Sequence, residues 1–206
     1  MAGITQNQQA SLVMKQKGKP FFQFGIQQPL AEAGGIIFPL TPTIQMSHSA
    51  NYGTYDVAGS IAQQNYYMNT SNPSMSVTAM FAANTTEEAL YSLAALQFLK
   101  TCTKSDFGSS STTAGTPPPI LKFSCYGTVH AKNVPVVLRN FTYTLPEDTD
   151  YVEVEIGGEK HSVPTLLLVS IELVPQQVPK RIKDNFDIRT FASGIGLRGG
   201  NTNGFI

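Results

Sequence analysis

A glycine-rich run at residues 194–199, with the sequence GIGLRG, matches the fingerprint of dinucleotide-binding folds. In those folds the glycines allow a tight turn and bring backbone amides close to a pyrophosphate at the start of a helix. Here only residues 200–206 follow the run, too few for the helix and second strand that would hold a cofactor. We therefore expect a flexible tail at this position and no bound cofactor.

The histidines and cysteines are the next candidates for chemistry, as metal ligands or nucleophiles. His48, His130 and His161 lie far apart in the sequence and show none of the paired spacings that zinc sites use. Cys102 and Cys125 have neither metal-ligand spacing nor the density of a disulfide scaffold, so we expect two reduced thiols. The sequence thus predicts no metal site.

An acidic cluster, formed by Glu147, Asp148 and Asp150, is the remaining candidate. Paired carboxylates can transfer protons in acid–base catalysis. A short acidic cluster that follows a proline between two strands is more typical of a solvated turn. The sequence also shows no nucleophile elbow, phosphate loop or metallohydrolase motif. We therefore expect no catalytic residues and a protein that is not an enzyme.

The composition favours an assembly protein. Charged residues make up 14% of the chain, against about 25% in typical domains, and the surface is instead rich in Ser, Thr, Asn and Gln. Few charges are expected where much of a surface is buried against partners, because ions are costly to desolvate. The 14 basic and 14 acidic residues cancel, which argues against duplex nucleic acid or an anionic membrane as a partner. No apolar run approaches the length of a membrane span.

The elements that must position any site are mainly strands. Alternating apolar residues predict a half-buried strand at residues 75–81. Further strands are predicted at residues 21–26, 120–126, 134–145, 151–156 and 165–174. Gly157 and Gly158 are predicted to form a hairpin turn between the last two of them. Strands on both sides of a single helix predict a mainly β fold: an antiparallel β-barrel or sandwich with one flanking α-helix at about residues 86–101.

That helix begins with a capping box, in which Thr85 and Glu88 each bond the other's backbone amide. Its apolar residues cover well over half of the circumference, which is too wide for one core face. Either the helix is wedged inside the domain, or it packs on its own core and on a neighbouring subunit. We predict a contact between residues 87–99 and a neighbour, with Tyr91 and Phe98 among the interface residues.

The segment from His48 to Pro73 is rich in Tyr, Asn and Gln and has no clean period, so it is predicted to be a long loop or an extended hairpin. Tyrosine and asparagine suit adaptable contacts between proteins. We expect this segment to be mobile in the monomer and ordered in an assembly. Its predicted interface residues are Tyr52, Tyr55, Tyr66 and Tyr67.

The chain divides into an N-terminal arm at residues 1–20, a β domain at residues 21–179 and a C-terminal docking arm at residues 180–206. The first arm is polar and is expected to be disordered, or ordered only by a partner. The second follows Pro175 and Pro179, which cannot donate to a strand ladder. It combines a basic cluster with spaced aromatic residues, predicted to lie at a partner interface: Lys180, Arg181, Lys183, Phe186 and Phe191.

Four ordered stretches, at residues 51–56, 116–127, 133–151 and 163–186, resemble the baseplate tail-tube proteins of T-even-type contractile-tailed bacteriophages. The resemblance covers roughly residues 50–195 and implies a tail-tube type of β-barrel. It also implies a homohexameric ring, in a virion assembled in the host cytoplasm, that initiates the tail tube. The implied partners are other copies of the chain, the baseplate hub protein, the tail-tube protein and a tape-measure protein in the lumen.

Two alternatives stay open at this point. An ordinary tail-tube or secretion-tube ring subunit would polymerise into long tubes alone, whereas an initiator would stop at rings or short stacks. A glycan-binding β-sandwich at the tail tip would be a monomer or trimer that binds sugar.

Overall fold

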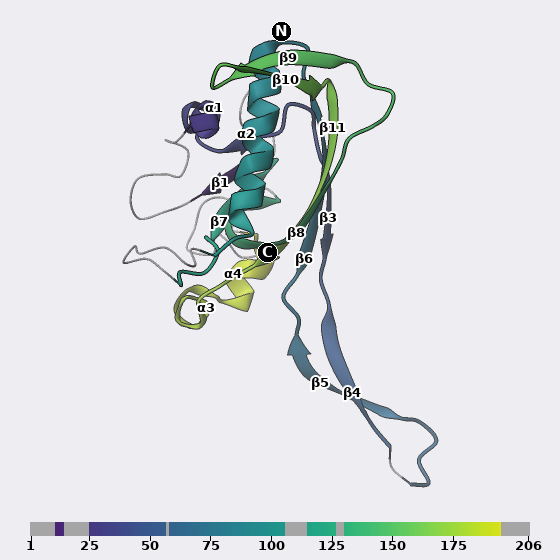
Figure 1. Cartoon of the computed structure of the whole chain (residues 1–206). Helices are drawn as coiled ribbons and strands as arrows, with labels where there is room; N and C mark the ends of the chain where they lie inside the picture. Colours follow the sequence, from purple (N-terminus) through teal and green to yellow (C-terminus); the bar gives the residue numbers. More distant parts are fainter. Residues whose placement is uncertain (1–10, 15–24, 57, 106–114, 127–129, 195–206) are drawn as a thin grey trace.

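The computed structural model describes residues 11–14, 25–56, 58–105, 115–126 and 130–194 (Figure 1). Within these residues the protein is mainly β, as predicted. Seven strands form one sheet in the order β2-β1-β7-β8-β11-β6-β3, and every neighbouring pair is antiparallel. The strands are β1 (Ser11–Met14), β2 (Ile36–Ile37), β3 (Thr43–Ser47), β6 (Ser74–Ala82), β7 (Leu121–Cys125), β8 (Ala131–Thr144) and β11 (Leu166–Pro175).

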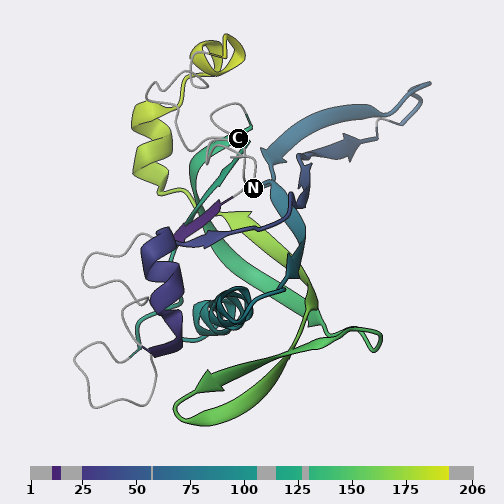
Figure 2. The ribbon, with the colours of Figure 1, turned by 90° about the horizontal axis from the view of Figure 1, so that it is seen from above.

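The sheet curls around one long helix, α2 (Thr86–Cys102), so that the described part of the chain forms an open half-barrel (Figure 2). Strand β6 shows the expected alternation, with Met75, Val77 and Ala79 buried toward the helix and the intervening side chains turned outward. The largest core cluster joins the inner face of the sheet to Phe98 and Leu99 of α2, both of which are fully buried.

Two hairpins leave this body. One, made of β9 (Tyr151–Ile156) and β10 (Glu159–Pro164), crosses the end of the molecule where α2 begins (Figure 1). Its turn residues Gly157 and Gly158 both have positive φ, 63° and 88°, which the tight turn of a two-residue hairpin requires. The other hairpin, made of β4 (Ala50–Tyr55) and β5 (Gln64–Thr70), extends away from the body.

Helix α2 begins as predicted. The Thr85 hydroxyl accepts a bond from the Glu88 amide at 3.3 Å, and the Glu88 carboxylate accepts bonds from the amides of Thr85 and Asn84, at 3.3 and 2.8 Å. The capping box therefore satisfies backbone amides that a helix start leaves without intrahelical partners.

The wide apolar surface of α2 is explained within the chain. One side of the helix packs on the sheet, and Ala89 on another side is buried under Val154 and Val163 of the β9–β10 hairpin. A short helical segment, η2 (Gly25–Gln27) and α1 (Gln28–Ala33), covers a further side. The first of the two alternatives, a helix wedged inside the domain, accounts for the pattern. The width of the apolar surface of α2 therefore no longer supports the predicted contact between this helix and a neighbouring subunit.

Several sequence predictions were wrong. The sequence predicts that residues 11–14 belong to an N-terminal arm, but they form β1 inside the sheet, between β2 and β7. The rest of the predicted arm lies outside the described residues. The sequence predicts a strand that includes Ile26, but Ile26 lies in η2, and residues 21–24 lie outside the described residues. Gly157 and Gly158 join β9 to the unpredicted strand β10, and β11 pairs with β8 and β6 instead.

The segment after the sheet is helical. Strand β11 ends at Pro175, as the prolines predicted, and two short helices follow, α3 (Pro179–Asn185) and α4 (Ile188–Ala192). None of the helices in the described residues is long and apolar enough to cross a membrane.

Candidate functional site

The described residues offer little for catalysis or metal binding. Among them, no three His, Cys, Asp or Glu side chains are grouped so that they could hold a metal ion. Glu147, Asp148 and Asp150 are exposed in the segment between β8 and β9, as expected for a solvated turn. Burial raises the pKa of the Cys102 and Cys125 thiols, to about 12 and about 11, so both are protonated and unreactive at neutral pH. The glycine-rich run lies outside the described residues beyond Gly194.

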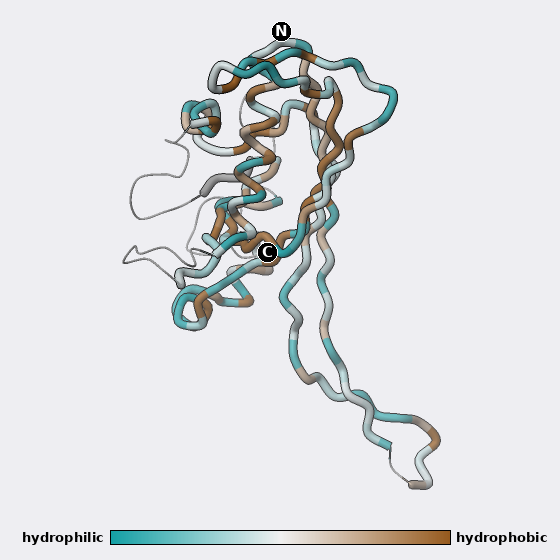
Figure 3. The backbone as a smooth tube through the Cα atoms, in the orientation of Figure 1, coloured by the Kyte–Doolittle hydropathy of each residue, from teal (hydrophilic) through white to brown (hydrophobic). Residues whose placement is uncertain are grey.

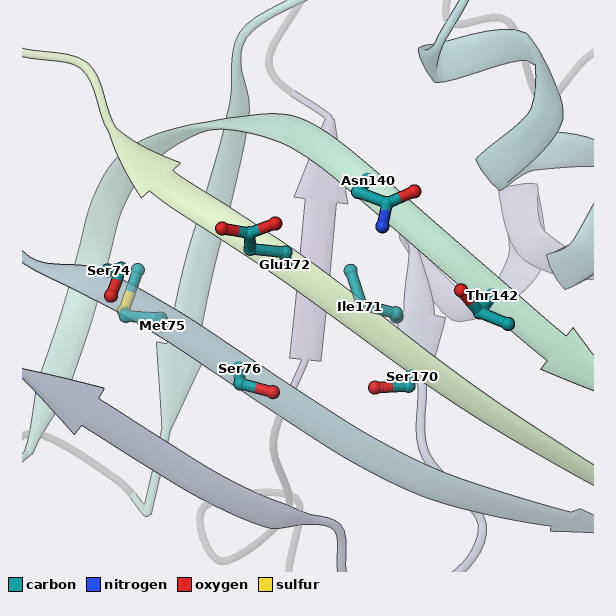
Figure 4. A pocket seen from close by; sticks show the side chains of 8 residues that line it. All are labelled: Ser74, Met75, Ser76, Asn140, Thr142, Ser170, Ile171 and Glu172. Atoms are coloured by element: carbon teal, nitrogen blue, oxygen red, sulfur yellow. The ribbon is translucent and has the colours of Figure 1, made fainter.

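A shallow pocket lies on the face of the sheet that is turned away from α2 (Figure 4). Small polar side chains from β6, β8 and β11 line it, among them Ser76, Thr142 and Ser170. Glu172 is the one ionisable residue of the lining, and its carboxylate pairs with Arg139 at 3.1 Å. The pocket therefore contains no pair of groups that could act as acid and base.

The strongest candidate is the β4–β5 hairpin, which is the surface predicted from residues 48–73. Figure 1 shows it continuing the line of β3 and β6 well beyond the body, and the extended-hairpin alternative is the one observed. Every residue of β5 is exposed, and no residue of β4 is buried. At the base of the hairpin the Asn51 amide nitrogen donates to the Asn69 side-chain oxygen at 2.7 Å and to the Ser71 hydroxyl at 2.9 Å. These bonds join the two strands where they leave the body.

One face of the hairpin carries a pair of tyrosines. Tyr52 and Tyr67 are directly opposite in the register, and their rings meet edge to face with centroids 5.9 Å apart. Such cross-strand aromatic pairs stabilise a two-stranded ribbon. The Tyr67 hydroxyl also shares a hydrogen bond of 2.6 Å with the Thr70 hydroxyl. The two rings are nevertheless 62% and 57% exposed, so most of their apolar surface is in water.

On the other face of the hairpin, a tyrosine ring covers a glycine. Gly53 lies opposite Tyr66, whose ring covers it so closely that a Cβ at position 53 would be 2.5 Å from the Tyr66 Cζ. The ring thereby shields glycine backbone that would otherwise be open to solvent. Tyr55, Tyr66 and Met68 on this ribbon are also more than half exposed. Gly53 and Met68 are not among the predicted site residues. Their place on this face follows from the alternation of side chains along a strand once the register is known.

The hairpin has few charges that would keep other chains away, and its ladder has a register irregularity between Asn51 and Tyr52, near its base. Asp56 is the one formally charged side chain between residues 49 and 73. Exposed strand edges are normally protected by lysines, prolines or bulges, because their free amides and carbonyls can pair with another chain. A single two-stranded hairpin is also only marginally stable in water. A long, uncharged, tyrosine-rich ribbon is therefore expected to be covered by a partner.

Two predicted interface residues have internal roles instead. Phe98 is fully buried in the core and is not available to a partner. The Tyr91 hydroxyl accepts a bond from the Ile37 amide at 2.7 Å and donates to the Ile37 carbonyl at 2.9 Å, so it fixes the short edge strand β2 to the helix. Burial raises the pKa of Tyr91, and the backbone bond to Ile37 partly opposes that effect. The sequence pattern marked both residues as apolar but could not distinguish core from interface.

The predicted docking residues lie on α3, on α4 and at Phe186 between them. Lys180, Arg181 and Lys183 are on α3, and the ring centroids of Phe186 and Phe191 are 5.6 Å apart across the bend between the helices. Neither helix has a buried residue. Asp187 starts α4 by accepting bonds from the Thr190 hydroxyl and amide at 2.7 and 3.0 Å, and these bonds lower its pKa.

No family model matches the chain, and no curated protein matches it.

Proposed function

We propose that this protein is a non-enzymatic structural subunit that assembles into a ring, with the β4–β5 hairpin as the main contact between subunits. The observation that carries the proposal is the hairpin itself. It projects from the sheet as an uncharged ribbon with exposed tyrosines on both faces and no buried residue on either strand. The four tyrosines supply the large, rigid contact area that dominates interface energetics, and the exposed, flexible Met68 side chain adds apolar surface.

The physical mechanism of such a subunit is templating. Each neighbour would bury the ring pair of Tyr52 and Tyr67 and hydrogen-bond to a free edge of the hairpin, as in recognition by strand addition. A closed ring leaves no hairpin edge free, so assembly stops when the ring is complete. The geometry of the ring then determines what can dock above and below it.

The sequence resemblance supports a particular setting for this ring. We propose that it is a hexamer at the junction of hub and tube in the baseplate of a contractile phage tail, where it initiates tube assembly. Its partners would be the baseplate hub protein on one side and the tail-tube protein on the other, with the tape-measure protein passing through the lumen. It would act in the virion, after assembly in the host cytoplasm.

Negative-stain electron microscopy of the purified protein tests this proposal. We expect rings that remain rings or short stacks alone and that extend into tubes only after tail-tube protein is added. The double variant Tyr52→Ser/Tyr67→Ser should form no rings, with a melting temperature within about 2 °C of wild type because both tyrosine rings are mostly exposed. The control Leu40→Ser/Ile120→Ser removes two exposed apolar side chains elsewhere and should still form rings. Long tubes without added tube protein, or rings formed by the tyrosine variant, would refute it.

A further inference from the structure

The charges of the protein are separated between its two ends, although the net charge is zero. Six of the 14 acidic residues lie between residues 147 and 159, on and beside the β9–β10 hairpin. Four of the 14 basic residues lie on α3 and α4. Figures 1 and 2 place these two regions on opposite sides of the body in both views. Neither region belongs to the β4–β5 hairpin, so the hairpin contact does not explain why acidic and basic residues are separated.

The acidic end combines carboxylates with exposed apolar side chains. Glu147, Asp148 and Asp150 are all exposed, and they are bracketed by Leu145 and Tyr151, which are 54% and 62% exposed. Helix α2 packs on the inner face of the β9–β10 hairpin. No element of the described part of the chain covers the exposed side chains around residues 145–151. Lys160 is the single lysine or arginine of β9 and β10, and it pairs with Glu153 at 3.2 Å. The surface therefore combines clustered carboxylates with exposed apolar side chains on either side of them in the sequence.

The basic end has the complementary composition. Lys180, Lys183 and Arg189 are exposed on α3 and α4, and Ile188 and Phe191 beside them are 70% and 43% exposed. In the hydropathy colouring of Figure 3, this segment alternates between hydrophilic and hydrophobic residues along its length. Asp187, one of its two acids, is already used to cap α4. The segment thus combines exposed basic and exposed apolar side chains, and protein interfaces combine the two kinds.

We infer that the α3–α4 segment of one copy docks on the acidic surface around residues 145–151 of a second copy, head to tail. The two surfaces lie on opposite sides of the body, so one chain cannot bring its own together. Complementary potentials steer such surfaces into register and suppress the head-to-head arrangement, in which like charges would meet. A head-to-tail contact joins different patches of the two copies, so it can join rings into the short stacks that the proposed function allows.

This interface is distinct from the ring contact assigned to the hairpin. The hairpin contact is uncharged and should tolerate salt, whereas the end-to-end contact depends on ion pairs that salt screens, with a Debye length of about 10 Å at 0.1 M salt. The inference goes beyond the proposed function. It stands whether or not the ring belongs to a phage tail.

Analytical ultracentrifugation of the full chain at low and high salt tests the inference. The arm variant carries Lys180→Glu, Lys183→Glu and Arg189→Glu, and the loop variant carries Glu147→Lys, Asp148→Lys and Asp150→Lys. Each variant alone places like charges on both surfaces and should lose the salt-sensitive association by about tenfold or more. An equimolar mixture of the two variants restores opposite charges at every contact, so association should return.

The control variant Glu32→Lys changes one exposed charge on α1 and should associate like wild type. Circular dichroism checks that each variant is folded. The tyrosine double variant of the hairpin should lose its rings but keep the salt-sensitive association, which separates a failure of the ring proposal from a failure of this inference. Association of wild type that is unaffected by salt, or a mixture that fails to recover, would overturn the head-to-tail contact.

Discussion

The hydroxyl of Tyr91 provides a sharp test of how the helix is fixed to the sheet. Tyr91→Phe keeps the ring and its packing but removes both hydrogen bonds to Ile37, of 2.7 and 2.9 Å. A typical intramolecular hydrogen bond contributes about 0.5–1.5 kcal/mol net, and a buried group left without a partner costs about 1–3 kcal/mol. Because Ile37 is only half-buried, water can replace part of what is lost. We expect the free energy of unfolding to fall by about 1–2 kcal/mol.

Urea denaturation followed by circular dichroism measures this change. The midpoint should fall with an unchanged m-value, since the surface exposed on unfolding is the same. Tyr151→Phe is the matched control, because Tyr151 is 62% exposed, and it should shift stability by less than about 0.5 kcal/mol. If Tyr91→Phe left monomer stability unchanged but weakened ring formation, Tyr91 would be an interface residue and the internal role argued here would be wrong.

Three further predictions concern the core and the helix start. Phe98→Ala should cost about 3–5 kcal/mol of unfolding free energy, measured in urea, because Phe98 is fully buried; a small loss would contradict its place in the core. Thr85→Ala should cost about 1 kcal/mol by loss of the cap, and a melting temperature equal to wild type would argue against the capping box. Burial raises the pKa of Cys102 from 9.0 to about 12, so the folded state keeps a proton that the unfolded chain releases. The free energy of unfolding should therefore fall as pH rises above 9, and this thiol should account for about 2 kcal/mol of the loss at pH 10.5. The loss should be smaller in Cys102→Ala. Equal losses in the two proteins would show that the Cys102 thiol does not cause the pH dependence.

Local signals predicted the elements whose pattern is set by their own residues. The capping box at Thr85 and Glu88 fixed the start of α2, and the alternation around Val77 identified β6 and its buried face. The prolines at 175 and 179 correctly marked the end of the sheet. These features depend on contacts within a few residues of the chain, which is why they can be read from the sequence.

Long-range pairing explains what could not be predicted. Strand β10 consists mainly of exposed polar residues, and only Val163 is buried, so it has no alternating pattern to detect. Strand β1 depends on pairing with β2 and β7, which its own polar surroundings do not reveal. The wide apolar arc of α2 indicated a second covering surface, but the pattern is the same whether a neighbour or the β9–β10 hairpin supplies it. The hairpin tyrosines, predicted as interface residues, are exposed, and their arrangement on two faces could be found only from the register.

Amide hydrogen exchange along the β4–β5 hairpin, compared between monomer and assembly, shows whether this hairpin is the contact between subunits. A hairpin that is a partner-covered arm should exchange quickly in the monomer, because its strands are exposed and a two-stranded ribbon is marginally stable. In the assembled ring the amides of β5 should become strongly protected, while β6 in the body changes little. Equal exchange of β5 in the two states would contradict the claim that this hairpin is the contact by which the protein assembles.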